Sequence, residues 1–226
     1  MKIGIFGNEN LAEELRSNPM IKEEIRSFSN WNEVPGGGDS FDIFFLFHDF
    51  RKLPVAAIQF ILSSVSLLGL NTIHGSSLTQ IQGKPELLKS VFGFIGLGGF
   101  LSRGLWEIGI PEKEMSKSHL EKLAGFGIEP LSVLDRVGLI SGRVLGMIIN
   151  EAYFTVMEGT ANKEDIDIAM KLGTNYPKGP FEMADLAGQK NLLSLLDNLF
   201  LETREERYKP CPMLRDEALK SDLQEQ

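Results

Sequence analysis

The chain has 226 residues, a net charge of −8 at pH 7 and one cysteine, Cys211. This length exceeds a common single domain of about 100–150 residues without reaching two full ones, so we expect a small first domain and a second after it. The acidic charge argues against a nucleic-acid partner, and a lone cysteine excludes an internal disulfide framework. With 42% hydrophobic residues and no signal peptide or membrane span, the sequence predicts a soluble, cytoplasmic protein.

The N-terminus has the pattern of the first strand, turn and helix of a dinucleotide-binding fold. An apolar run ends at Gly7, and helical character follows over residues 11–15. In a functional glycine-rich motif of this fold, the second glycine lets the backbone approach the pyrophosphate of the cofactor. The third glycine lets the helix pack closely on the strand. Glu9 and Ala12 stand in those places, and Glu9 puts a carboxylate at the positive end of the helix dipole. Gly7, Glu9 and Ala12 are therefore the candidate cofactor-binding residues, but they argue against ordinary dinucleotide binding.

The next elements continue an α/β pattern. Strands are expected at residues 25–28, 41–47 and 67–73, with a loop at residues 35–39 and a helix from about residue 54. The apolar run over residues 55–70 contains Gln59, three serines and Gly69, so it reads as a helix followed by a strand and not as a membrane helix. No acidic residue stands directly after residues 25–28 to hold a ribose, although Asn30 or Asn32 is an alternative.

Histidines follow two of these strands. His48 and His74 are placed where the carboxyl ends of parallel strands gather ligands, and His74 is the better candidate for a relocated catalytic base. A structural role is the alternative for both residues, because a lone histidine at a strand end is usually a loop residue with one hydrogen bond. His119 falls in a charged helix predicted at residues 112–122. The histidines and the loop thiol Cys211 lack paired ligand spacing, so no metal site is predicted.

The most specific sequence motifs lie near the C-terminus, in residues 161–173 and 176–182. Asn162 can cap a helix that has acids in its first turn and ends at Gly173, and the Pro177-Lys178-Gly179-Pro180 segment imposes a turn before another amphipathic helix. These two segments resemble the C-terminal domain of 3-hydroxyacyl-CoA dehydrogenases. The resemblance implies an abbreviated Rossmann-like domain over residues 1–134, followed by an all-helical dimerisation domain over residues 135–226.

The resemblance also assigns roles to single residues. Glu107 matches the family's glutamate, which orients a histidine that takes the proton of the 3-hydroxyl as hydride leaves for NAD. Ile95 stands at the position of that histidine, and Gly142 at the position of a substrate-contacting asparagine. Ser76 matches a substrate-contacting serine, although two serines after a strand can simply satisfy turn hydrogen bonds. Glu107, His74 and Ser76 are therefore the candidate catalytic residues.

Further departures from the family pattern weaken the functional inference. The glycines over residues 96–99 are predicted to form a flexible turn, and there is no room before residue 41 for the helical insertion that contributes to the family's acyl-CoA cleft. Three functions stay open: an NAD-dependent 3-hydroxyacyl-CoA dehydrogenase that works through rearranged residues, a pseudoenzyme that binds an acyl-CoA or a protein partner, and a structural homodimer.

Overall fold

The computed structural model describes residues 1–7, 9–34, 40–111 and 117–224. It divides into two compact units, the first formed by Met1–Gly96 with Phe100–Leu139 and the second by Leu97–Gly99 with Ile140–Gln226. The loop predicted at residues 35–39 and the first part of the helix predicted at residues 112–122 lie outside the described residues. Within the described ranges, no helix is long and apolar enough to cross a membrane.

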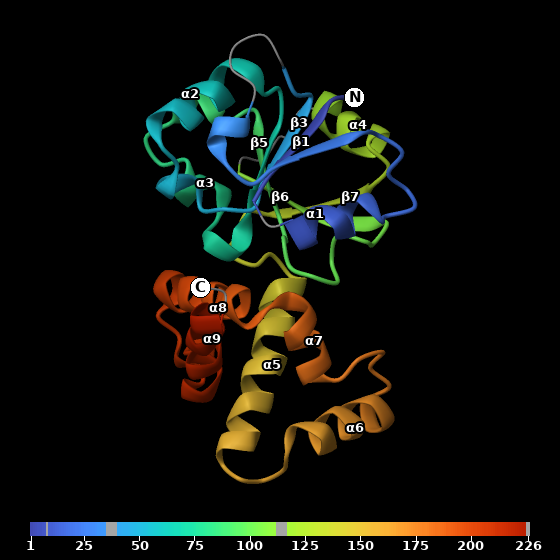
Figure 1. Cartoon of the computed structure of the whole chain (residues 1–226), viewed down its shortest axis with the longest axis vertical. Coiled ribbons are helices and arrows are strands. Elements are labelled where there is room, and N and C mark those ends of the chain that lie inside the picture. The colour runs from blue at the N-terminus through green and yellow to red at the C-terminus, as the bar shows by residue number, and fades with distance from the viewer. Residues whose placement is uncertain (8, 35–39, 112–116, 225–226) are drawn as a thin grey trace. The chain divides into compact units, whose positions relative to one another are not determined.

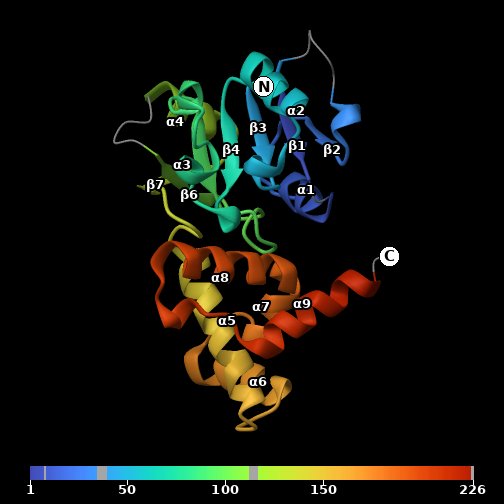
Figure 2. The same cartoon turned by 90° about the vertical axis from the view of Figure 1, so that its left-hand side faces the viewer.

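The first unit is built around one sheet (Figure 1). Its helices and strands, in chain order, are β1 Ile3–Phe6, α1 Glu9–Arg16, β2 Ile25–Phe28, β3 Ile43–Leu46, α2 Val55–Ser64, β4 Leu68–Asn71, α3 Ser77–Gln80, β5 Val91–Phe94, β6 Leu105–Ile110, α4 Lys117–Gly125 and β7 Glu129–Leu134. The described strands form a seven-stranded sheet in the order β2-β1-β3-β4-β5-β6-β7, which Figure 2 shows side by side. All neighbours pair in parallel except β5 and β6, which are antiparallel.

Helices cover both faces of this sheet, with α1 and α4 on one side and α2 and α3 on the other (Figure 1). The inner strands β1, β3, β4 and β5 are fully buried and mostly apolar on both faces, as expected for parallel strands between two helical layers. The two sides have separate cores: α1 contributes Leu11, Ala12 and Leu15 to one, and α2 contributes Ile61 to the other. The predicted α/β fold of the N-terminal part is confirmed.

The second unit is helical, as predicted. Its helices are α5 Ser141–Met157, α6 Lys163–Thr174, α7 Pro180–Ala187, α8 Gln189–Thr203 and α9 Pro212–Gln224. Its core is formed by buried residues of the central helices, among them Ile149, Tyr153, Leu192, Leu195 and Leu196.

Two local expectations in this unit need correction. Helix α6 begins as predicted, with Asn162 accepting a hydrogen bond from the Asp165 N–H at 2.8 Å, but it continues past Gly173. It ends at Asn175, which adopts the left-handed conformation (φ 57°) that asparagine tolerates at a helix end. Cys211 lies between helices as expected, but it is fully buried and its N–H donates to Asn150 at 2.8 Å, so it is a packing residue.

Candidate active site

The candidate catalytic residues gather at the carboxyl edge of the sheet. His74 and Ser76 follow β4 and Ile95 follows β5, while Gly7 follows β1. Strand β1 has β2 on one side and β3 on the other, so the strand order reverses there, which is the place where doubly wound sheets bind ligands. His74, Ser76, Ile95 and Gly7 therefore all follow strands at the edge of the sheet where the sequence predicted a site.

Ile95 and Glu107 lie on the two segments that meet where the sheet turns antiparallel. Gly93 on β5 pairs with Gly109 on β6, Ile95 directly follows β5, and Glu107 lies within β6. Ile95 is only 6% exposed, and Glu107 is half-buried and has a polar or electrostatic partner. The position to which the resemblance assigns the catalytic histidine is therefore a buried alkyl side chain with no lone pair.

His74 is the third residue of a 3₁₀ turn, Thr72–His74, and holds two loops together. Its Nε2 lies 2.9 Å from the carbonyl oxygen of Phe47, which can only accept, so Nε2 carries the proton. The Arg51 guanidinium donates to the His74 carbonyl at 2.7 Å. Burial is the main influence on the His74 pKa and lowers it, against the opposing effects of the Phe47 carbonyl and Asp49. His74 is therefore neutral at pH 7, and one ring nitrogen is committed to a structural hydrogen bond.

Ser76 caps the short helix α3. Its hydroxyl lies 3.3 Å from the Thr79 N–H and 2.9 Å from the Thr79 hydroxyl. Asp135, at the end of β7, accepts hydrogen bonds from the N–H groups of Ser77 and Leu78, each at 3.0 Å. The first turn of α3 is thus satisfied within the protein, which is the turn-stabilising role that we weighed against substrate contact.

Asn71 organises this edge and was not identified from the sequence. Both polar atoms of its buried side chain bond to Gly96: Oδ1 accepts from the N–H at 3.0 Å and Nδ2 donates to the carbonyl at 3.1 Å. A Cβ at Gly96 would lie 2.6 Å from that nitrogen. The first of the three glycines in residues 96–99 is therefore held by two hydrogen bonds, and is not flexible as predicted. The available signal was a single asparagine in the apolar run at residues 67–73.

The candidate cofactor-binding residues lie at the start of α1. Gly7 has a φ of 135°, which favours glycine, and Ala12 is packed in the core between α1 and the sheet. The Glu9 carboxylate accepts from Arg16 at 2.7 Å and from Ser27 at 3.2 Å, and the Arg16 hydrogen bond is the main cause of its lowered pKa. Its charge is therefore largely balanced within the protein, which reduces the repulsion that we expected.

A carboxylate does lie near the end of β2, contrary to our expectation. Glu33 folds back so that its oxygen lies 3.4 Å from the Ser29 N–H. An acid in this place can hold a ribose, but the first turn of α1 still carries the Glu9 side chain where a pyrophosphate needs bare backbone. The residues present therefore do not fit the pyrophosphate of NAD. No metal cluster is formed either, since no three His, Cys, Asp or Glu residues converge within the described ranges.

The signature residues of the helical unit form a helix cap. The buried Asp167 on α6 accepts from the N–H groups of Phe181 and Glu182, at 2.8 and 3.1 Å, and so caps α7. A Cβ at Gly179 would collide with the Asp167 carboxylate, so only glycine fits there. Glu182 in turn accepts from the Gly179 N–H at 3.0 Å and from Lys171 at 2.5 Å. This motif is explained by packing alone.

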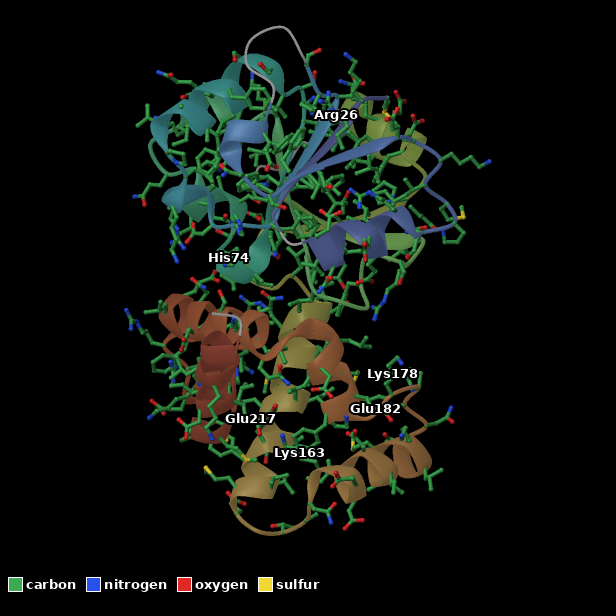
Figure 3. All side chains as sticks on the ribbon, viewed as in Figure 1. Arg26, His74, Lys163, Lys178, Glu182 and Glu217 are labelled. Carbon is green, nitrogen blue, oxygen red and sulfur yellow. The ribbon has the colours of Figure 1, made fainter. Side chains whose placement is uncertain are left out.

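A second polar cluster joins four helices of this unit, and Figure 3 labels two of its members, Lys163 and Glu217. The Glu217 carboxylate accepts from Lys163 at 2.7 Å and from the Tyr153 hydroxyl at 2.8 Å. The Lys163 ammonium also lies 5.2 Å from the ring centres of Tyr153 and Phe181. Burial, with Glu217 second, raises the pKa of Tyr153, so this tyrosine is a hydrogen-bond donor and not a base.

Residues 138–226 match the sequence model of the 3-hydroxyacyl-CoA dehydrogenase C-terminal domain. A similar curated protein is the 3-hydroxyadipyl-CoA dehydrogenase of Escherichia coli (strain K12), 45% identical over 89 residues, which are 39% of this chain and 19% of that protein. The crystal structure of an Escherichia coli 3-hydroxybutyryl-CoA dehydrogenase aligns with a TM-score of 0.61 at 30% identity, over 70% of this chain and 33% of that one.

Similarity over the whole chain is weaker in sequence. The (S)-3-hydroxybutyryl-CoA dehydrogenase of Ralstonia eutropha aligns with a TM-score of 0.68 over 95% of this chain and 92% of that one, at 19% identity, which indicates the fold alone. The matched segment spans about a fifth to a third of the length of the first curated relatives. Residues 138–226 are therefore similar to the C-terminal domain of 3-hydroxyacyl-CoA dehydrogenases, and the rest of the chain shares the fold of these proteins.

Proposed function

We propose that the chain is a 3-hydroxyacyl-CoA dehydrogenase-like protein, descended from NAD-dependent oxidoreductases of 3-hydroxyacyl-CoA, in which hydride-transfer chemistry is weakened or lost. The observation that supports this most directly is the buried side chain of Ile95, directly after β5, at the position to which the resemblance assigns the catalytic histidine. A carboxylate that orients a base requires a base beside it, and isoleucine cannot accept a proton. Loss of an acid–base residue removes about 10²–10⁴-fold in rate, so weak residual activity is compatible with this proposal.

Other substitutions point the same way. Gly142 lies buried in the first turn of α5 and offers no polar side chain for a substrate carbonyl. His74, the best substitute base, has Nε2 engaged with Phe47. Glu9 occupies the turn that a pyrophosphate would approach. Each substitution removes a different requirement of the reaction, so the proposal does not depend on one alignment position.

The test is NADH-dependent reduction of acetoacetyl-CoA, followed optically at high protein concentration. We expect no turnover, or only a slow rate, above a buffer control. Glu107→Ala should leave that rate unchanged, because the glutamate no longer serves a base. Turnover at ordinary dehydrogenase rates that collapses in His74→Ala would show that a relocated base works and would overturn the proposal.

The second candidate is a catalytically inactive protein that binds acyl-CoA or a protein partner, or a structural homodimer formed by the helical unit. It is supported by exposed apolar side chains: Val144 on α5 is 55% exposed and Leu172 on α6 is 83% exposed. An apolar pocket of about 470 Å³ also borders α5, lined in part by Met147, Ile148 and Met170.

Light scattering of the purified chain, with Val144→Glu as the disrupting variant and Glu158→Gln as its control, tests the dimer. A cytoplasmic location is part of the same proposal.

A further inference from the structure

The face of the first unit that α2 and α3 cover lacks charged side chains over a long stretch of sequence. Residues 53–83 contain no aspartate, glutamate, lysine or arginine, although 24% of the whole chain is charged. Burial explains this for β4, which lies inside the sheet, but α2 lies on the outside of the sheet (Figure 1). Depletion of charged residues on an exposed surface is a property of protein–protein interfaces.

Helix α2 has one buried side and one exposed side. Ala57 and Ile61 are buried and face the sheet. The exposed residues of the helix are Val55, Ala56, Gln59, Leu62 and Ser63. At about 100° per residue, these five positions form one stripe with Gln59 at its centre. Val55 is 71% exposed and Leu62 is 40% exposed, so the stripe presents apolar side chains and no charge to its surroundings.

The stripe is complementary to itself when two copies of α2 lie antiparallel. A two-fold axis through Gln59 brings together positions that lie equally far before and after it. Val55 then faces Ser63 of the second copy, and Leu62 faces Ala56, so each large side chain meets a small one. Gln59 meets its own copy, and a side-chain amide can both donate to and accept from another amide. Such self-complementarity is what a symmetric dimer contact requires.

Electrostatics favours the same occupant. Because the chain has a net charge of −8, two copies repel each other wherever acidic surfaces approach. No carboxylate belongs to the stripe, so contact through α2 places no acid against an acid.

We propose that the exposed stripe of α2 is a symmetric contact surface for a second copy of this chain. The contact lies in the first unit, so it is separate from the homodimer proposed for the helical unit and does not depend on whether the chain retains catalysis. One pair of 10-residue helices is a small interface, below about 1,200 Å², so we expect an association that depends strongly on protein concentration.

Disulfide cross-linking of the full chain tests the register of the contact. Gln59→Cys places a thiol on the two-fold axis, beside its own copy. The matched control is Ser63→Cys, which is exposed on the same helix, but its two copies would lie about 12 Å apart along the helices, beyond the reach of a disulfide. The native Cys211 is fully buried and does not compete. Under mild oxidation, the covalent dimer of Gln59→Cys should form about tenfold faster than that of Ser63→Cys.

Sedimentation velocity tests the contact without a cross-link. Val144→Glu is used as the background, because it removes the contact proposed for the helical unit. In this background the chain should still associate as its concentration rises, and adding Leu62→Glu should leave a monomer. Adding Gln82→Glu, which brings the same charge to an exposed position outside α2, should not. Equal cross-linking rates in Gln59→Cys and Ser63→Cys, or association that is absent or unaffected by Leu62→Glu, would overturn the proposal.

Discussion

A buried aspartate caps a helix in each of the two units, and the surroundings of the two differ. Asp167 accepts two N–H groups at the start of α7, and Asp135 accepts two at the start of α3. Around Asp167, nearly all residues resemble the sequence motifs of the family. In the unit that contains Asp135, Ile95 stands at the position to which the resemblance assigns a histidine. The same structural device is thus kept in both units, whereas two positions to which the resemblance assigns chemistry are replaced, Ile95 in the first unit and Gly142 in the second.

This difference separates evidence for descent from evidence for activity. The contacts of Gly179, Asp167 and Glu182 in the helical unit are explained by steric fit and capping, so they are evidence for the fold and not for an activity. The sheet edge carries chemistry in a dehydrogenase, and here the side chains of Asn71, His74 and Gln80 are hydrogen-bonded to backbone carbonyl groups. Similarity over residues 138–226 therefore does not carry the reaction with it.

Gly179→Ala should have the largest effect, because the new Cβ would meet the Asp167 carboxylate and displace the cap of α7. We expect a loss of about 3 kcal/mol in the free energy of unfolding of the helical unit. Urea denaturation followed by circular dichroism measures it.

Gly173→Ala is the matched control, since nothing lies within 4 Å of the position that its new Cβ would take and the residue is inside α6. This change should stabilise the unit by about 0.5 kcal/mol, the helix preference of alanine over glycine near a helix end. Equal losses in the two variants would show that the Asp167 contact is not what requires Gly179.

Ser76→Ala separates capping from substrate contact. Removal of the N-cap hydroxyl should reduce the free energy of unfolding by about 1 kcal/mol and leave coenzyme A affinity unchanged. A calorimetric titration beside the melting curve measures both quantities. A large loss of affinity without a change in stability would mean that Ser76 contacts a ligand.

His74→Gln should change how stability responds to acid. Burial lowers the pKa of folded His74, so below about pH 6.5 the unfolded chain takes up a proton that the folded chain does not. The stability of the wild type therefore falls as the pH decreases from 6.5 to the folded pKa, and each unit of pKa lowering contributes about 1.4 kcal/mol to that fall. Urea midpoints at pH 7 and pH 5 should differ less in His74→Gln, and identical differences would contradict the assignment.

Glu9→Gln should have the smallest effect. The Arg16 hydrogen bond lowers the pKa of Glu9, so its contribution is present above the ordinary carboxyl pKa and is lost as the pH falls through the folded pKa. Because the Glu9 side chain is 48% exposed, we expect only about 0.5 kcal/mol at neutral pH. Thermal melts at pH 7 and pH 3, with Glu13→Gln as control, should show a difference only at pH 7.

Local sequence signals predicted most of the fold. The apolar strands, the Asn162 cap and the turn at Pro177 were each visible within a few residues of chain. The site was predictable only in part, because its bonds join distant segments: Asp135 reaches Ser77 across 58 residues and Asn71 reaches Gly96 across 25. The position of the Glu33 carboxylate near the end of β2 was missed for a related reason. It depends on the turn between Ser29 and Glu33, which the sequence pattern did not predict.

The most direct test compares acetoacetyl-CoA reduction by the wild-type chain with that of the double variant Glu9→Gly/Ile95→His, using NADH as reductant. The variant removes the Glu9 side chain from the helix turn and places a proton acceptor at the position to which the resemblance assigns the catalytic histidine. We predict no wild-type turnover above buffer and a measurable rate in the double variant that disappears when Glu107→Ala is added. Wild-type turnover within the usual enzymatic range of about 1–10³ s⁻¹ would contradict the account, because it would show that this sheet edge is catalytic as it stands.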